Sequence, residues 1–249
     1  MSSQTTYLIS GTTRGIGRGL VKSLLARPNT TVIAGVRDTQ AKTALSLNDL
    51  PKANGSNLIL IKIDASIETD PQDAIATLQK THNITSLSTV IANAGILDPN
   101  DFLPSGQVSP QAFRTHFEIN TLAAITLFQA TFPLLQASSQ TPKFIVTTSS
   151  IGSNIIAKNL GAPVVAYGVS KAAINYFVNK ASGEYPEIRF GLIHPGLVET
   201  DMSKPFVEMT AGKIPSISVE ESVRGYLERV DEVGNGVRFL QYDGEELAW

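Results

Sequence analysis

The stretch TTYLISGTTRGIG, Thr5 to Gly17, leads from a β-branched apolar run through a glycine-rich turn into the start of an apolar helical pattern. Glycines at 11, 15 and 17 permit tight turning of the backbone and close approach of a phosphate. The helix that follows points free N–H groups at an anion. Glycines alone indicate only an ordinary strand–helix turn, but a strand, this loop and a helix in that order predict a dinucleotide site.

The rest of the chain alternates apolar β-branched runs with stretches of helical period. Further strands are expected at 30–36, 57–64, up to Ala92, 143–149, 188–195 and 237–243. Helices are expected at 15–28, where Pro28 stops the first, and at 39–50, 70–82, 109–136 and 167–182. Nearly continuous apolar strands in βαβ order predict an α/β fold, a doubly wound, mostly parallel sheet with helices on both faces. Residues 196–218 have little periodicity and suggest a lid over the substrate.

Composition narrows the class of protein. With 249 residues, 42% hydrophobic, the chain has the size of one α/β domain, residues 1–249. The 20 basic and 22 acidic residues give a net charge of −2, which favours neither nucleic acid nor an anionic membrane. The absence of cysteine excludes disulfides and thiolate chemistry. No apolar run would span a bilayer and no charged region precedes the first strand, so a soluble, cytoplasmic protein is expected.

Charge around the second strand indicates which dinucleotide is bound. An NAD enzyme usually places a carboxylate at the end of this strand to bond the ribose 2′-hydroxyl. Here Val36 and Arg37 occupy that place, and Arg14 lies in the glycine loop. Two guanidinium groups suit a 2′-phosphate, so NADP(H) is predicted. Asp38 could cap a helix or partly repel the phosphate.

Six motifs along the chain resemble those of the short-chain dehydrogenase/reductase family. They are SGTTRGIG at 10–17, NAG at 93–95, EIN at 118–120, TTSS at 147–150, YGVSK at 167–171 and HPGLVET at 194–200. The segment GRGLVKSLLARPNTTVIAGVRD is more similar to the fungal norsolorinic acid ketoreductase-like enzymes of aromatic polyketide pathways. The resemblance covers essentially the whole chain. It implies a seven-stranded Rossmann-type sheet and hydride transfer at a carbonyl or carbinol carbon.

The chain contains two Tyr–Lys pairs at a spacing of four, Tyr167 with Lys171 and Tyr176 with Lys180. Residues four apart share one face of a helix. The two tyrosines are nine positions apart, about 900° of rotation at roughly 100° per residue, so they point in opposite directions. Tyr167 follows a loop that descends from Ser149 and is the site candidate. Tyr176 suits packing or a subunit contact.

The resemblance also implies the chemistry of that pair. Tyr167 would donate the proton as general acid, and Lys171 would lower its pKa and bond the nicotinamide ribose. A serine would bond the substrate oxygen; Ser149 fits the SxxG pattern ending at Gly152, with Ser150 as the alternative. Asn120 would hold a water that links Lys171 to solvent.

A larger set of residues is expected to hold the cofactor. Asp64 would accept from the adenine amino group or cap the next helix, and Asn93 to Gly95 would line the ribose. The complete predicted set is Gly11, Thr13, Arg14, Gly15, Ile16, Gly17, Arg37, Asp64, Asn93, Ala94, Gly95, Tyr167, Lys171, Pro195, Val198 and Thr200. The three histidines, His82, His116 and His194, have no ligand spacing, and no metal is expected.

The favoured hypothesis is NADPH-dependent reduction of a ketone or aldehyde, such as an aromatic polyketide-type ketone, to an alcohol. An NAD(P)+-dependent alcohol dehydrogenase and a non-catalytic NADP(H)-binding redox sensor are the alternatives. The substrate pocket is expected from 96–108, 151–165 and 197–215. A homodimer or homotetramer is expected through the helices at 109–136 and 167–182, as the resemblance implies.

Overall fold

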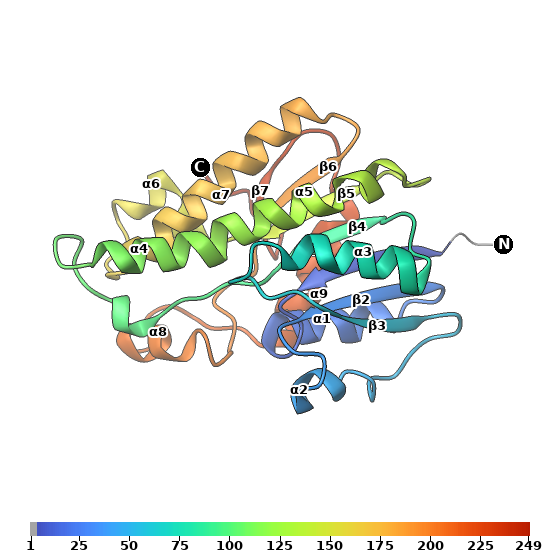
Figure 1. Ribbon diagram of the computed structural model, residues 1–249. Coiled ribbons are helices and arrows are strands. Elements are labelled where there is room, and N and C mark those ends of the chain that lie inside the picture. Colours follow the sequence, from blue (N-terminus) through green and yellow to red (C-terminus); the bar gives the residue numbers. More distant parts are fainter. Residues whose placement is uncertain (1–3) are drawn as a thin grey trace.

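A twisted sheet of seven strands forms the centre of the computed structural model, which describes residues 4–249 (Figure 1). The strand order is β3-β2-β1-β4-β5-β6-β7, and every neighbouring pair is parallel. The predicted doubly wound, seven-stranded Rossmann-type fold is confirmed. The strands are β1 (Thr5–Ser10), β2 (Thr30–Val36), β3 (Asn57–Lys62), β4 (Thr89–Ala92), β5 (Lys143–Thr147), β6 (Arg189–His194) and β7 (Phe239–Gln241).

Helices cover both faces of this sheet (Figure 1). The longer ones are α1 (Gly15–Leu25), α3 (Asp70–His82), α4 (Pro110–Phe117), α5 (Ala123–Gln136), α7 (Val165–Glu184) and α9 (Val219–Glu232). The short ones are α2 (Lys42–Leu45), η1 (Pro99–Asp101), η3 (Ser150–Gly152), α6 (Asn154–Ala157) and α8 (Lys204–Met209). Within residues 4–249, no helix combines the length and the hydropathy that crossing a membrane requires.

Alternation along the strands divides the core into two layers. In β1, Leu8 packs with α3, α5 and α7 on one face, whereas Tyr7 and Ile9 pack with α1 and α9 on the other. Both layers are buried, and for this reason the strands have apolar side chains at consecutive positions. Strand β2 could be predicted from sequence for this reason, since all seven of its residues are buried.

The order of the strands reverses at β1, whose neighbours are β2 on one side and β4 on the other. The connections from these strands leave on opposite faces of the sheet, so a crevice opens beyond their carboxyl ends. The glycine loop after Ser10 and the segment after Ala92 both begin at this edge. The fold therefore brings the two motifs together at the place where a dinucleotide binds in open α/β sheets.

Three helices differ from the sequence-based expectation. The helix expected at 39–50 is only the four-residue α2, because polar turns around Ser46 and Asn48 take over its backbone hydrogen bonds. The helix expected at 109–136 is interrupted by a π-turn, η2 (Glu118–Leu122), between α4 and α5. Helix α9 was not predicted, although Ser218 accepts from the backbone N–H of Glu221 as the SVEE capping sequence indicates.

Candidate active site

A cavity of about 550 Å³ lies beyond the carboxyl ends of β1, β2, β4 and β5. Every residue predicted to hold the cofactor lines it, except Val198. Val198 is buried, and its backbone pairs with Ile217 inside the segment that follows β6. Residues from the expected lid, Thr200 to Met202, form part of the cavity wall.

The glycine loop has the shape that a pyrophosphate requires. Gly11 has φ +69°, and a Cβ there would lie 2.8 Å from the Cα of Ala94. A Cβ at Gly17 would overlap the carbonyl oxygen of Gly11. Helix α1 begins without a side-chain cap and without an acidic residue in its first turn, so its N-terminal N–H groups can bond an anion. The loop therefore fits the phosphates of a dinucleotide.

Two arginines line the cavity, Arg37 directly after β2 and Arg14 in the glycine loop. Arg14 forms an exposed ion pair with Asp201 at 3.2 Å. Burial raises the pKa of the Asp64 carboxyl, but hydrogen bonds from Ser66 and the charges of Arg37 and Lys62 outweigh it and leave that pKa below its ordinary value.

The two aspartates at strand ends stabilise turns. Asp64 accepts from the backbone and hydroxyl of Ser66 at 2.9 and 2.8 Å, so it does not cap α3. Asp38 accepts from the backbone N–H of Gln40 at 2.8 Å, in the turn before α2. Both carboxylates thus have local partners that account for their positions.

Helix α7 brings the first Tyr–Lys pair to the cavity, where Tyr167 and Lys171 form part of the lining. The Tyr167 hydroxyl is hydrogen-bonded to Ser149. The Lys171 Nζ lies 5.7 Å from the centroid of the Tyr167 ring and donates to the Thr147 carbonyl oxygen at 2.9 Å. The second pair points away, since the side chain of Tyr176 is 73% exposed and Lys180 pairs with Glu184 at 3.0 Å.

Burial dominates the protonation of this pair. It raises the pKa of Tyr167 to about 12, although the hydrogen bond to Ser149 lowers it in part. Burial also lowers the pKa of Lys171 to about 8. The sequence-based expectation was that Lys171 lowers the pKa of Tyr167. In the protein alone, desolvation outweighs that effect and keeps the phenol protonated at neutral pH.

The two adjacent serines have different partners. The Ser149 hydroxyl bonds Tyr167 and accepts from the backbone N–H of Ile151 at 3.2 Å. The Ser150 hydroxyl lies 3.3 Å from Nε2 of His194. Burial lowers the pKa of His194 to about 4, so its imidazole is neutral at pH 7. Only Ser149 of the two has its hydroxyl against the tyrosine.

Asn120 lies in the π-turn between α4 and α5 and connects three segments. Its Oδ1 accepts from the Ile96 N–H at 2.8 Å, and its Nδ2 donates to the Ile96 carbonyl and to the Ser170 hydroxyl, both at 3.0 Å. The two amide donors are thus used within the protein, and the oxygen keeps one free lone pair. A Cβ at Gly95 would lie 3.0 Å from that oxygen and 3.6 Å from the Lys171 Nζ, so both groups lie beside this glycine.

Other polar contacts at this edge were not predicted from sequence. Asn93 donates to the carbonyl oxygens of Ser10 and Gly11 at 3.1 Å, and the Ser10 hydroxyl accepts from the N–H groups of Asn93 and Ala94 at 3.1 Å. Thr147 gives its carbonyl oxygen to Lys171 and bonds the buried Tyr226 with its hydroxyl at 2.8 Å. The NAG motif was the available signal for Asn93. Nothing in sequence distinguishes the role of Thr147.

The histidines occur singly, and among residues 4–249 no three metal-ligating side chains lie close enough to hold an ion together. His82 is exposed at the end of α3. Both ring nitrogens of His116 have hydrogen-bonding partners, whereas His194 is bonded only at Nε2, by Ser150, and its buried Nδ1 has no partner among the described residues.

Comparison with known proteins agrees with this geometry. The norsolorinic acid ketoreductases of Dothistroma septosporum and Emericella nidulans are 40% and 36% identical to this chain, over 100% and 99% of it and 94% of each relative. An NADPH-bound carbonyl reductase from chicken fatty liver superposes with a TM-score of 0.83 at 27% identity, over 99% of this chain and 100% of that one. The carbonyl reductase Sniffer of D. melanogaster gives 0.82 at 30%, with the same coverage.

The family model described as short chain dehydrogenase matches residues 5–211. That range includes the glycine loop, the Tyr167–Lys171 pair and the Ser149 hydroxyl described above. The chain therefore belongs to the short-chain dehydrogenase family.

Proposed function

We propose that this protein is an NADP(H)-dependent reductase that converts a ketone or aldehyde to an alcohol, with Tyr167 as the general acid. The observation that carries the proposal is that Tyr167 and Lys171 line the cavity, with the Lys171 Nζ beside the phenol ring and Ser149 hydrogen-bonded to the phenol. A redox sensor that binds the cofactor without turnover would not need these three groups together.

The cofactor would supply the hydride when bound, and the chain's own residues donate the proton that the substrate oxygen gains. The Ser149 hydroxyl bonds the substrate oxygen and stabilises the negative charge that develops there. Tyr167 donates its proton to that oxygen. A pKa of about 12 keeps this phenol protonated at neutral pH, which suits reduction better than alcohol oxidation. Lys171, with a pKa of about 8, is mostly protonated at pH 7 and returns a proton to the phenolate.

Proton supply to Lys171 would pass through a water held by the free lone pair of Asn120. The Asn120 Oδ1 and the Lys171 Nζ both lie beside Gly95, 3.0 and 3.6 Å from the position that a Cβ there would take, so a single water would bond to both.

The preference for NADP(H) is proposed on the charges near β2. Arg14 and Arg37 both line the cavity, and no carboxylate occupies the end of the strand, where Val36 precedes Arg37. Arg37 also lies close enough to influence Asp64. Guanidinium groups bond a 2′-phosphate in two-pronged fashion, whereas a 2′-hydroxyl gains little from them. The chicken carbonyl reductase was solved with NADPH bound.

The substrate class is proposed as an aromatic polyketide-type ketone, which the names of two relatives support. The apolar side chains of Ile96, Ile119 and Met202 line the cavity next to Tyr167. The lid at 196–218, in one domain with the rest of the chain, includes helix α8, and the exposed Met202 and Met209 provide apolar surface for flat rings.

Steady-state oxidation of NADPH with a panel of aryl ketones and quinones tests the proposal. Wild-type protein is expected to turn over at least one of them. Tyr167→Phe should lose at least about 100-fold in kcat while retaining NADPH affinity, and Tyr176→Phe, at the exposed tyrosine of the same helix, should retain full activity. Tight NADPH binding without turnover of any carbonyl would favour the sensor, and faster alcohol oxidation with NAD+ would favour the dehydrogenase.

A homodimer or homotetramer is proposed through α4, α5 and α7. Phe117 on α4, Leu122 at the end of η2, and Tyr176 on α7 are 39%, 36% and 73% exposed. Apolar side chains at such exposure suit a subunit contact. Sedimentation of the wild type and of Tyr176→Asp tests it, and a wild-type monomer at micromolar concentration would contradict it.

A further inference from the structure

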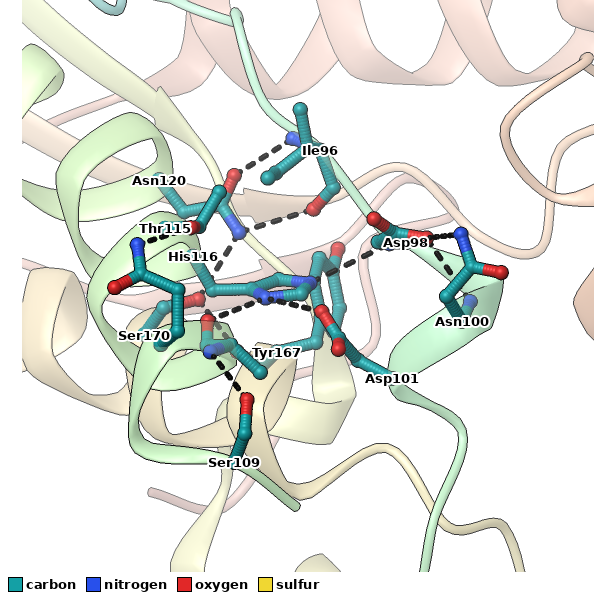
Figure 2. Close-up of polar contacts among 12 residues, drawn as sticks. Ile96, Asp98, Asn100, Asp101, Ser109, Thr115, His116, Asn120, Tyr167 and Ser170 are labelled. Carbon is teal, nitrogen blue, oxygen red and sulfur yellow. Dashed lines mark hydrogen bonds and ion pairs between the residues drawn. The ribbon is translucent and has the colours of Figure 1, made fainter.

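His116 connects the segment after β4 to the catalytic helix, and none of the motifs described above includes it. It lies on α4, one helical turn before Asn120, and only 1% of its surface is exposed. Figure 2 shows its imidazole between the segment that carries Asp98 and Asp101 and the side chain of Tyr167.

Both ring nitrogens of His116 have partners. Nε2 lies 3.4 Å from the backbone N–H of Asp98, which can only donate, so Nε2 accepts (Figure 2). Nδ1 then carries the proton and donates to the carbonyl oxygen of Ala112 at 2.9 Å. The Asp101 carboxylate lies 3.6 Å from the same nitrogen. The tautomer is thereby fixed, and the ring cannot turn over without losing both bonds.

The same ring contacts the proposed general acid. The imidazole and the Tyr167 ring meet edge to face, with centroids 6.4 Å apart and planes at 81°. Asn120, at the next turn, bonds Ser170 of the catalytic helix and Ile96 of the post-β4 segment. His116 and Asn120, one helical turn apart, therefore both contact the post-β4 segment and the catalytic helix α7.

The segment that His116 holds also supports the lid. Asp101 ends the short helix η1, and Phe102 follows it directly. The Phe102 ring packs edge-on against Phe206 of α8, with centroids 6.4 Å apart and planes at 88°. A line of contacts therefore runs from Tyr167 through His116 and residues 98–102 to the lid helix.

We propose that His116 is a positioning residue that sets the distance between the Tyr167 hydroxyl and the cavity wall at Ile96 and Met202, the lining residues that lead into residues 97–102 and α8. It makes the pocket selective for a bulky carbonyl compound, one long enough to touch that wall while its carbonyl oxygen lies against Tyr167. This inference rests on the proposed carbonyl reductase function and adds to it a residue that decides specificity.

A role in packing alone would not need this residue type. A buried polar ring is stabilised only when its nitrogens are bonded, and an apolar side chain of the same size would fill the space without that requirement. The bond to Ala112 stays within α4 and fixes the ring on its own helix, whereas the bond from the Asp98 N–H joins α4 to the post-β4 segment, so what this second bond adds is relative position. Loss of one such bond corresponds to about a tenfold change in an equilibrium.

The test compares a variant of His116 that loses the hydrogen bonds with one that loses the aromatic ring. His116→Phe keeps an edge-to-face ring beside Tyr167 but loses both hydrogen bonds. His116→Gln keeps a donor and an acceptor but loses the ring. The exposed His82→Phe is the matched control. Each protein is assayed with NADPH and two carbonyl compounds: a bulky aryl ketone that reaches the wall and a small aldehyde that does not.

His116→Phe is expected to raise KM for the aryl ketone about tenfold, with KM for the aldehyde and Kd for NADPH within twofold of wild type. His116→Gln is expected to recover most of the aryl ketone KM, and His82→Phe to behave as wild type. An equal loss of kcat/KM with both carbonyl compounds in His116→Phe, weaker NADPH binding, or no change at all would overturn the proposal.

Amide hydrogen exchange keeps this inference distinct from the proposed function. If the wild type reduces no carbonyl compound, the proposed function fails. Amide exchange still reports how firmly the segment beside the cavity wall is held in place. His116→Phe should then speed exchange in residues 97–103 at least about tenfold, with β1 and β4 unchanged. Unchanged protection of residues 97–103 would refute the role given to His116.

Discussion

Replacement of Lys171 by methionine is expected to stabilise the protein at pH 7 and to inactivate it. Lys171 is 4% exposed, and moving its pKa from 10.5 to about 8 corresponds to about 3 kcal/mol of unfavourable charge burial, at about 1.36 kcal/mol per pH unit. Methionine lacks the charge but also lacks the bond to the Thr147 carbonyl, which contributes about 1 kcal/mol. The variant should therefore be more stable than the wild type by about 2 kcal/mol.

The difference between the two proteins should depend on pH in a defined direction. Below about pH 8 the lysine is protonated in both the folded and the unfolded wild type, so the cost of burial is constant. Between about pH 8 and 10.5 the unfolded state binds more protons than the folded state, and wild-type stability rises with pH. At about 1.36 kcal/mol per pH unit, the advantage of Lys171→Met should vanish near pH 9.5.

Urea unfolding of the cofactor-free protein at pH 7, 8, 9 and 9.5 measures this difference. Lys180→Met is the matched control, since Lys180 is exposed on the same helix and pairs with Glu184; its effect should be small and should not vary over this range. A Lys171→Met protein less stable than wild type at pH 7, or a stability difference that does not change with pH, would refute the reasoning about buried charge. kcat with NADPH should fall by at least about 100-fold.

Arg37→Ala should weaken NADPH binding about 10- to 100-fold and leave NADH binding within about threefold, as measured by cofactor fluorescence; equal loss for both would contradict a 2′-phosphate contact. Ser149→Ala should lower kcat about 100-fold and Ser150→Ala less than fivefold, because only the Ser149 hydroxyl bonds the tyrosine, and the reverse order in steady-state assays would reassign the serine. Gly17→Ala should abolish binding of either cofactor in a calorimetric titration, because a methyl group there would overlap a backbone carbonyl of the loop; binding within threefold of wild type would contradict the close approach.

Much of the fold could be predicted because burial on both faces leaves a strong local pattern. All residues of β2 and β4 are buried, and their runs are apolar or β-branched throughout. Helix α9 was missed although its SVEE start was present, since no resemblance pointed to it. The helix expected at 39–50 was overestimated because the Ser46 hydroxyl and the Lys52 ammonium donate to the backbone carbonyls of Thr43 and Asn48, local bonds that the helical period does not reveal.

The candidate site was predictable to the extent that its residues belong to motifs. The positions of Tyr167 and Lys171 at the cavity agree with the opposite directions inferred for the two Tyr–Lys pairs. The pKa of Tyr167 was not predictable, because the balance between a nearby amine and desolvation depends on how tightly the chain closes around the phenol. His116 joins segments that are far apart in sequence, so no spacing rule could identify it.

The two functions of Thr147 have a consequence for random mutagenesis. Its carbonyl oxygen accepts from the proposed proton-relay amine of Lys171 on α7, and its hydroxyl bonds Tyr226 on α9, which packs in the other core layer. One residue of β5 therefore connects the two layers of the protein through its own backbone and side chain. Substitutions of Tyr226 are expected to alter turnover without a contact to substrate or cofactor, and a screen for activity should find them.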